Sequence, residues 1–387
     1  MDKKINQKNA YDICIYSHFD NDNAVQEYVL EAIKRINDDG FGVIFVTTSK
    51  KINDEDIEKI KKYCLSIIIR ENIGYDFGSY KAGFEYVVNS NIKYSKILFT
   101  NDSVYGPFCS LKKQIELLKK YDIVGVTDSF DTHYHLQSYF LLFGEIASNS
   151  KEFRSFWDSV EYIPNDNSNF KNLIIQKYEI GGSQSFISKG FKLGASNDSI
   201  SMFNKLNKIQ IEKMQNAKIN NGSRINFYQF RENMTHFYWD LLLMEKCPYI
   251  KRELIARNPL NIDISKWPNL INELTSYPLE LIVSALMEYT KSTDFAFTTQ
   301  KININEMSKD GTIILTPQPL LAKYIKNLPR SKVFHFDEEF YLEKNIDVKN
   351  AVMLQLCNGA IDHFISSGHY ENRQINFSST KIKKHDR

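Results

Sequence analysis

Short apolar segments alternate with amphipathic segments over the first third of the chain, and this alternation constrains the fold more than any other feature. Five of the apolar segments have the length and composition of buried strands: Asp12–Tyr16, Val43–Thr47, Leu65–Ile69, Ile97–Thr100 and Ile123–Val126. The segments between them repeat apolar residues at helical spacing, for example from Val25 to Ile36. Strands that alternate with helices predict an α/β fold with a mostly parallel sheet and right-handed crossovers.

A glycine-punctuated segment, Asn72–Phe84, follows the third predicted strand. Gly74, Gly78 and Gly83 permit positive φ angles or a close approach of the backbone to other atoms. The fourth predicted strand ends next to Asp102. Ligands of open α/β sheets bind beyond the carboxyl ends of the strands. The sequence therefore predicts that Asp102 lies at an edge of the sheet that holds a nucleotide, a sugar or a metal ion.

Two later segments carry polar residues in suggestive positions. His135–Phe143 reads as one long strand, whose alternation places Gln137 and Tyr139 on the same face. Tyr178–Gly194 reads as a loop bearing Glu179, followed by a helix and a strand. We expect the first segment to lie inside the sheet and the second to bring a carboxylate to the sheet edge.

The length and composition suit a protein of two domains. The chain has 387 residues, and we predict an α/β domain over residues 1–262 and a mostly helical appendage over residues 263–387. The formal net charge of +2 gives no argument for nucleic acid as a partner. The polar N-terminus predicts no signal peptide, and no apolar run is long enough to span a bilayer. A membrane-lipid acceptor would therefore require docking of the protein on the membrane surface.

The order of these segments resembles a GT-A glycosyltransferase, in which a short acidic motif ends the fourth strand of a nucleotide-binding sheet. More specifically, the chain resembles the rhamnan synthesis protein F family over roughly residues 10–260. The segments that carry this resemblance are Asn72–Lys81, Asn101–Pro107, His135–Phe140, Tyr178–Gly181, and Thr235–Asp240 with Tyr249–Leu254.

The resemblance implies a bacterial sugar transferase that acts in surface polysaccharide assembly, in the cytoplasm or at the inner face of the membrane. It further implies dTDP-L-rhamnose as the donor and a saccharide or a lipid-linked saccharide as the acceptor. Two alternatives stay open: a transferase that uses another nucleotide sugar, and a non-catalytic module that binds glycan or scaffolds an assembly complex.

The two acidic positions of this fold fall on Glu179 and Asp102. Glu179 is the predicted catalytic base, because an inverting transfer needs a carboxylate that removes the proton of the acceptor hydroxyl. Its alternative role is a helix-start carboxylate. Asp102 is predicted to bind the donor diphosphate, directly or through Mg²⁺ or Mn²⁺, and its alternative role is a strand-end turn. Asn101 and Ser103 flank a single aspartate where the fold usually has two, which leaves metal dependence open.

Other polar residues are candidates for ligand contacts. Donor contacts are expected from Asn101 and Ser103. We also expect His18 to contact the base or a phosphate, and Asp76 to contact the base or the ribose. Lys81 is expected to pair with a phosphate or with Asp76, and His236 to bind the diphosphate or a metal. Acceptor contacts are expected from Gln137, Tyr139 and Trp239. Lys251 and Arg252 could neutralise leaving-group charge. The alternatives are a salt-bridged loop for Asp76 and Lys81, packing for the histidines and aromatic rings, and solvated charges for the basic pair.

Overall fold

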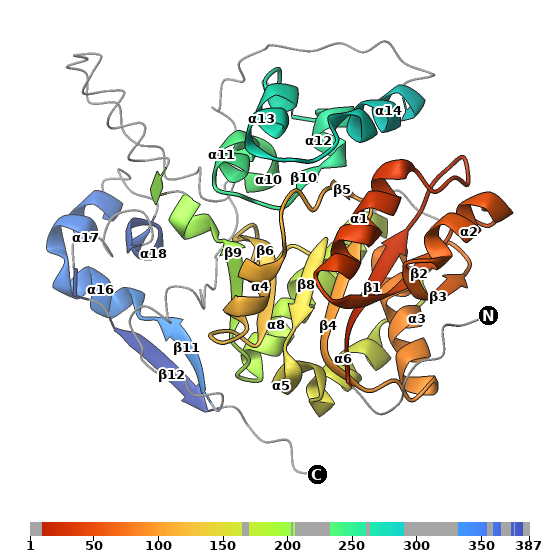
Figure 1. Ribbon diagram of the computed structural model, residues 1–387. Coiled ribbons are helices and arrows are strands. Elements are labelled where there is room, and N and C mark those ends of the chain that lie inside the picture. Colours follow the sequence, from red (N-terminus) through yellow and green to blue (C-terminus); the bar gives the residue numbers. More distant parts are fainter. Residues whose placement is uncertain are drawn as a thin grey trace.

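A central sheet with helices on both faces forms the main body of the protein, as the computed structural model shows (Figure 1). The structure describes residues 10–164, 170–202, 204–205, 233–260, 264–289, 332–353, 359–364, 373–374 and 376–381. A group of helices from the second half of the chain lies at one end of the sheet, and a C-terminal unit lies beside it (Figure 1).

The sheet has eight strands in the order β3-β2-β1-β4-β8-β6-β7, with β9 paired to β6. The strands are β1 (Tyr11–His18), β2 (Phe41–Thr47), β3 (Cys64–Ile69), β4 (Tyr94–Asn101), β6 (Ile123–Ser129), β7 (His135–Leu136), β8 (Phe140–Phe143) and β9 (Leu193–Asn197). β1 to β4 are mutually parallel, whereas β8 runs antiparallel to both β4 and β6. The five predicted strands and the mostly parallel sheet are therefore confirmed.

Helices cover both faces of the sheet and bury two apolar cores. In the first half of the chain they are α1 (Glu27–Asp38), α2 (Asp54–Lys61), α3 (Tyr75–Asn89), α4 (Lys112–Leu117), α5 (Glu145–Ser148), α6 (Lys151–Ser159), α7 (Phe170–Ile174), the π-helical turn η1 (Ile175–Ile180) and α8 (Gly181–Ser188). The core on one face includes Val29 and Ile33 of α1, and the core on the other includes Phe84 of α3 and Trp157 of α6. Alternate residues of the strands supply each core, as expected for strands buried on both faces.

Helix α3 packs directly on β1 because Gly83 has no side chain. A Cβ atom at this position would lie 2.4 Å from Cγ2 of Ile15. We expect Gly83→Ala to lower the free energy of unfolding by about 1–3 kcal/mol, since the extra methyl group forces two buried elements apart. Urea denaturation measures this loss. Gly359→Ala is the control, because an added Cβ there meets no atom within 4 Å; equal stability losses in both variants would contradict the packing argument.

The predicted long strand His135–Phe143 is wrong, because a turn at Ser138 and Tyr139 separates β7 from β8. The backbone of Ser138 pairs with side chains instead of with a neighbouring strand. Its amide donates to Oε2 of Glu179 at 3.0 Å, and its carbonyl oxygen accepts from the Tyr80 hydroxyl at 3.0 Å. The strand alternation predicted for Gln137 and Tyr139 therefore does not apply.

Glu179 lies in a helix and not in the predicted loop. α7, η1 and α8 follow one another without a break, so no loop precedes the helix that was predicted to follow Glu179. A π-helical turn inserts an extra residue into a helix and often occurs at functional sites. Glu179 sits within this turn.

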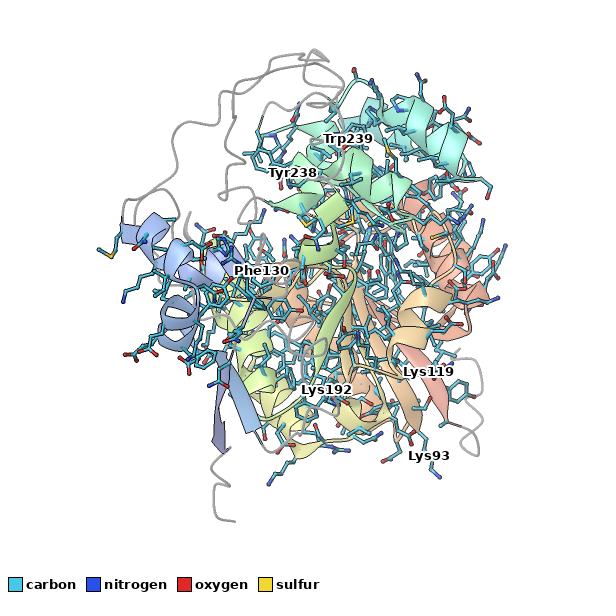
Figure 2. All side chains as sticks on the ribbon, turned by 90° about the vertical axis from the view of Figure 1, so that its left-hand side faces the viewer. Lys93, Lys119, Phe130, Lys192, Tyr238 and Trp239 are labelled. Atoms are coloured by element: carbon cyan, nitrogen blue, oxygen red, sulfur yellow. The ribbon has the colours of Figure 1, made fainter. Side chains whose placement is uncertain are left out.

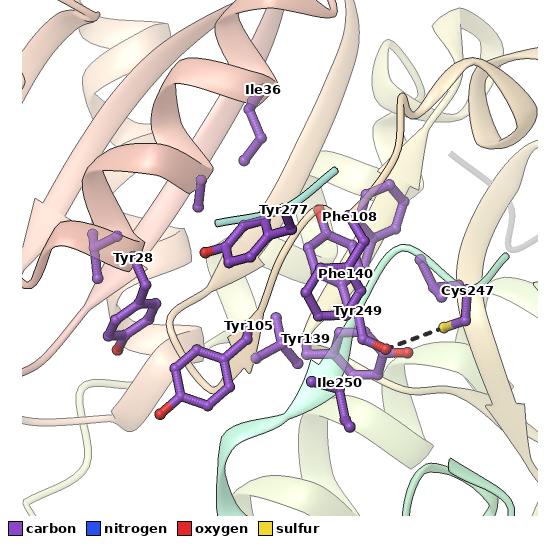
Figure 3. Packing of buried hydrophobic residues seen from close by; sticks show 14 of the residues in the cluster. Tyr28, Ile36, Tyr105, Phe108, Tyr139, Phe140, Cys247, Tyr249, Ile250 and Tyr277 are labelled. Atoms are coloured by element: carbon purple, nitrogen blue, oxygen red, sulfur yellow. Dashed lines mark hydrogen bonds between the residues drawn. The ribbon is translucent and has the colours of Figure 1, made fainter. Parts of the chain in front are cut away.

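The second half of the chain adds a layer at the carboxyl end of the sheet. Its elements are α10 (Met234–Phe237), α11 (Trp239–Met244), β10 (Ile250–Lys251), α12 (Arg252–Ala256), α13 (Trp267–Leu274) and α14 (Leu279–Tyr289), and they adjoin the short strand β5 (Val104–Tyr105) from the first half of the chain. β10 pairs antiparallel with β5. Tyr277 packs 5.1 Å from the ring of Phe108, and Tyr249 packs against Tyr139 and Phe140 (Figure 3). Packing thus continues across residue 262, and the domain boundary placed there stays a prediction.

A strand pair and three helices form the C-terminal unit: β11 (Lys332–Phe336), α16 (Glu338–Lys344), α17 (Ile346–Met353), α18 (Ala360–His363) and β12 (Phe377–Lys381). The antiparallel pairing of β11 with β12 was not predicted. Asp337 caps α16 by accepting from the Phe340 amide at 3.0 Å. Among the helices that the structure describes, none has the length and apolarity needed to cross a membrane.

Candidate functional site

The carboxyl ends of β1 and β4 meet the start of α3 in one polar cluster. Ser17 is paired with Asn101 in the register of the two strands. Asp76, in the first turn of α3, accepts from the Ser17 hydroxyl at 3.1 Å and from the Asn101 side-chain amide at 2.8 Å. Burial raises the pKa of Asp76 to about 6, and the nearby charge of Asp102 adds to this rise. The glycine-rich segment and the acidic motif therefore meet at this edge of the sheet.

Asp102 is paired with an arginine that lies far from it in the sequence. Its Oδ2 lies 3.2 Å from Nη1 of Arg252 and accepts from the Phe19 amide at 3.3 Å. The same Nη1 donates to the Asp102 carbonyl oxygen at 2.8 Å and to the Tyr28 hydroxyl. The Arg252 amide donates to the carbonyl oxygen of Ser103 at 2.9 Å. The arginine thus holds both the side chain and the backbone of the acidic motif.

These residues do not fit a divalent metal ion. Asp102 faces the Arg252 guanidinium, and the side-chain carbonyl of Asn101 accepts from the Ser103 hydroxyl at 2.6 Å. Burial, together with the charge of Lys251, lowers the pKa of His236 to about 4. Within the described residues, no group of three or more His, Cys, Asp or Glu side chains could hold a metal. Hard cations need several oxygen ligands, and the carboxylates of Asp102, Asp76 and Glu179 are each already paired with other side chains.

Glu179 is held as an ionised carboxylate. Its Oε2 accepts from the amide and the hydroxyl of Ser138, and its Oε1 lies 3.5 Å from Nε2 of His135. Burial acts to raise the pKa of Glu179, but the bonds from His135 and Ser138 outweigh it and leave the pKa below its ordinary value. A carboxylate in this state can accept a proton near neutral pH, as a general base must.

Lys251 is a buried cation that lies near the carboxylates of Glu179 and Asp76. Its ammonium lies 4.1 Å from the centre of the Tyr139 ring. Burial lowers the pKa of Lys251 to about 8, while the charges of Glu179 and Asp76 act in the opposite direction. Asp76 in turn is influenced by both Asp102 and Glu179. Asp102 and Glu179 therefore both lie near enough to Asp76 to influence its pKa, and Lys251 lies near Glu179 and Asp76.

Comparison with known proteins assigns the family. The family model described as "Rhamnan synthesis protein F" matches residues 43–360. The chain belongs to the rhamnan synthesis protein F family. The predicted resemblance is thereby confirmed, and the predicted α/β fold with a mostly parallel sheet is confirmed as well.

Two curated relatives share part of their length with this rhamnan synthesis protein F family member. It is 32% identical over 165 residues to "Uncharacterized protein y4gN" of Sinorhizobium fredii, covering 40% of this chain and 41% of that protein. It is 30% identical over 231 residues to "Virulence protein VirA" of Vibrio anguillarum, covering 58% of this chain and 72% of that protein. The chain thus spans less than half of the first relative.

Solved glycosyltransferases are similar at low identity. GlyE of Streptococcus pneumoniae TIGR4 is 11% identical, with 76% of this chain and 66% of that chain covered and a TM-score of 0.34. The galactosyltransferase LgtC, solved with donor and acceptor sugar analogs, is 12% identical, with 70% and 98% covered and a TM-score of 0.30.

Two predicted donor contacts need correction. The His18 ring is 1% exposed, its Nδ1 lies 3.0 Å from the Thr47 hydroxyl, and it packs on Phe45. It joins β1 to β2 and offers no surface to a donor. Lys81 donates to the carbonyl oxygens of Asp158 and Val160 at the end of α6. It therefore fastens α3 to α6 and does not pair with Asp76.

The predicted acceptor contacts also lie in the core. Tyr139 and Trp239 are 3% and 4% exposed, and they line a cavity that has room for about one water molecule. Gln137 accepts from the Thr127 hydroxyl at 2.6 Å, and the Tyr139 hydroxyl lies 2.8 Å from the same oxygen. The packing alternative therefore holds for both aromatic rings. His236 is also buried, although it lies near Lys251.

A second hollow lies away from this edge. It is lined by Lys96, Lys119, Tyr121 and Gly144 among others. Figure 2 shows Lys119 in the lower half of the view, well below Trp239. This hollow therefore does not belong to the cluster of acidic and basic residues.

Sequence reasoning missed the residues that support the two carboxylates. His135 and Ser138 were part of a segment read as a strand, so their bonds to Glu179 were not expected. Tyr28 belongs to the periodic apolar face of α1, and nothing in that pattern indicated its contact with Arg252. The family segment that includes Lys251 and Arg252 was the available signal, but it did not reveal their pairing with the acidic motif.

Proposed function

We propose that this protein is an inverting rhamnosyltransferase. It transfers L-rhamnose from dTDP-L-rhamnose to a saccharide or lipid-linked saccharide during assembly of a bacterial surface polysaccharide. The observation that carries the proposal is the ionised Glu179 carboxylate, oriented by His135 and Ser138 at the same edge as Asp102 and Lys251. The family supports a sugar-transfer role. We place the reaction in the cytoplasm or at the inner face of the membrane, with residues 1–262 carrying the transferase site.

The proposed mechanism is a single displacement at the anomeric carbon. Glu179 removes the proton of the acceptor hydroxyl while its oxygen forms the new bond to the anomeric carbon. The bond from that carbon to the diphosphate oxygen breaks, and the electron pair leaves with the dTDP. Lys251 and Arg252 stabilise the charge that develops on the leaving group. The roles of Asp76 and Asn101 are to bind the nucleoside side of the donor.

A donor screen tests this function. The purified protein is mixed with a saccharide acceptor and with dTDP-L-rhamnose, UDP-glucose or GDP-mannose, and release of the nucleoside diphosphate is followed. We expect release from dTDP-L-rhamnose to be at least about tenfold faster than from the other donors, because a buried polar site discriminates strongly between hydrogen-bonding ligands. Faster release from another donor would support a transferase activity but contradict rhamnose as the donor sugar. Absence of release from every donor would contradict the transferase activity itself.

A non-catalytic module is the second candidate, and one observation favours it. The single aspartate of the acidic motif is already paired with Arg252. A module that only binds glycan predicts that dTDP leaves the melting temperature unchanged, whereas a transferase predicts a rise, since a ligand of the folded state stabilises it. Thermal unfolding with and without dTDP separates the two candidates.

A further inference from the structure

Two consecutive cations are fixed beside the acidic motif by main-chain hydrogen bonds. β10 and β5 pair in a register that places Lys251 opposite Val104. The Arg252 amide donates to the Ser103 carbonyl oxygen at 2.9 Å. The positions of both cations relative to Asp102 therefore follow from backbone pairing and do not depend on flexible side chains alone.

Half of the Arg252 guanidinium is available to a ligand. Within the part of the chain that the structure describes, every hydrogen bond of this guanidinium runs through Nη1, to Tyr28 and to Asp102. The side chain is 28% exposed. A guanidinium presents five N–H donors in a planar fork that matches phosphate oxygens. Nε and Nη2 of Arg252 thus retain donors for a phosphate group.

Among the residues that the structure describes, the Lys251 ammonium has no hydrogen-bonded anion. It lies over the Tyr139 ring, and no described residue accepts a hydrogen bond from it or forms an ion pair with it within 4.0 Å. Burial of a cation is costly unless an anion compensates it, and burial is the main reason for its lowered pKa. An anion placed between Lys251 and Arg252 would remove this cost.

We propose that Lys251 and Arg252 bind the donor's diphosphate in place of a divalent cation, so that the protein binds its nucleotide sugar without a metal. A metal bound at Oδ2 of Asp102 would have to displace the guanidinium that lies 3.2 Å from this oxygen. The pair instead neutralises Asp102 and leaves donors for the diphosphate. This inference rests on the proposed function for the identity of the ligand, and it extends that function to the chemistry of the leaving group.

Calorimetric titration with inorganic pyrophosphate and with dTDP tests the inference. We expect both to bind in EDTA with affinities within about threefold of those in excess Mg²⁺ or Mn²⁺, since charged hydrogen bonds replace metal coordination. Lys251→Met should weaken binding by about tenfold or more, the usual effect of losing a partly buried charge partner. The control is Lys120→Met, because Lys120 also lies over an aromatic ring, 5.0 Å from the centre of the Tyr121 ring, and is exposed.

The pH dependence of dTDP affinity separates the two modes of binding. The charged and titratable groups that influence Lys251 are Glu179, Asp76, Lys171, Glu253 and His236. Between pH 7 and 9, Lys251 loses its proton as the pH passes its pKa of about 8, whereas Glu179 and Asp76 stay ionised and His236 stays neutral. We therefore expect dTDP affinity to fall over this range. If a metal bridged the protein and dTDP, the affinity would stay constant or rise over the same pH range, because metal ligands must be deprotonated.

Each outcome decides the inference. Binding of pyrophosphate that requires Mg²⁺ or Mn²⁺, or that fails in every condition, overturns it. The inference is also overturned if folded Lys251→Met binds pyrophosphate with unchanged affinity. Arg252→Gln is the second variant, and unchanged affinity in it would confirm that result. Metal-free binding of pyrophosphate without transfer from any nucleotide sugar would support the anion site and reject the proposed function, so the two failures are distinguishable.

Discussion

Replacing Glu179 by glutamine should lower the rate of sugar transfer by about 10²–10⁴-fold, the usual contribution of a positioned general base. The amide keeps the size of the side chain but cannot take the proton of the acceptor hydroxyl. The affinity for dTDP should change little, because the nucleotide is expected to contact the other side of the edge, near Asp76 and Asn101. Release of dTDP from dTDP-L-rhamnose, with and without acceptor, measures the rate, and calorimetric titration with dTDP measures the affinity.

Glu161→Gln is the matched control for this variant. Glu161 is an exposed glutamate from the same region, and its carboxylate lies 2.9 Å from the Lys177 ammonium. Its transfer rate should stay within about twofold of the unmodified protein, because exposed ion pairs contribute little. Transfer at an undiminished rate in folded Glu179→Gln would reject the base assignment. A loss of dTDP binding in that variant would instead indicate that Glu179 holds the donor.

The positioning of Glu179 can be tested separately from its chemistry. Ser138 donates from both its amide and its hydroxyl to the carboxylate, so Ser138→Ala keeps one of the two bonds. Because these bonds help to hold the pKa of Glu179 below its ordinary value, their partial loss should raise that pKa. The acid limb of the pH–rate profile should therefore move to higher pH in Ser138→Ala. An unchanged limb, with an equal loss of rate at every pH, would assign Ser138 a purely structural role.

The sheet could be predicted from sequence because its signals are local. The strand segments Val43–Thr47 and Ile97–Thr100 are continuous apolar runs between helices of regular period, and both lie where the alternation placed them. The meeting of the acidic motif with the glycine-rich segment follows from the same reasoning, since parallel strands end at one edge. Asp76 and Asn101 accordingly contact each other in the structure.

The supporting contacts could not be predicted because they join segments that are far apart in the chain. The bond between Ser138 and Glu179 interrupts a stretch whose apolar pattern is that of a strand, so long-range side-chain pairing overrides the local signal. The ion pair between Asp102 and Arg252 spans 150 positions. Local periodicity carries no information on such a pair. Only the resemblance to the family indicated that both residues belong to segments with a role in donor binding.

Removing the Asp102 carboxylate should destabilise the protein more than removing an exposed partner of the same kind. Asp102→Ala leaves the Arg252 guanidinium without its counter-charge at a site where the two side chains are 28% and 12% exposed. Loss of one partner of a fully buried pair costs about 3–5 kcal/mol, and the partial exposure here reduces our expectation to about 2–3 kcal/mol. Asp347→Ala is the control, because its ion pair with Arg373 has a carboxylate that is 62% exposed; its effect should stay below about 1 kcal/mol.

A double-mutant cycle shows whether this loss comes from the ion pair. In Asp102→Ala with Arg252→Met the uncompensated cation is gone, so the double variant should be more stable than the sum of the two single losses implies, by about 1–3 kcal/mol. Urea denaturation of the four proteins gives the coupling energy. Additive losses would show that Asp102 acts through its bond with the Phe19 amide and its place in the strand-end turn. The cycle thus tests, without any sugar substrate, whether an arginine holds the acidic motif in place of a metal.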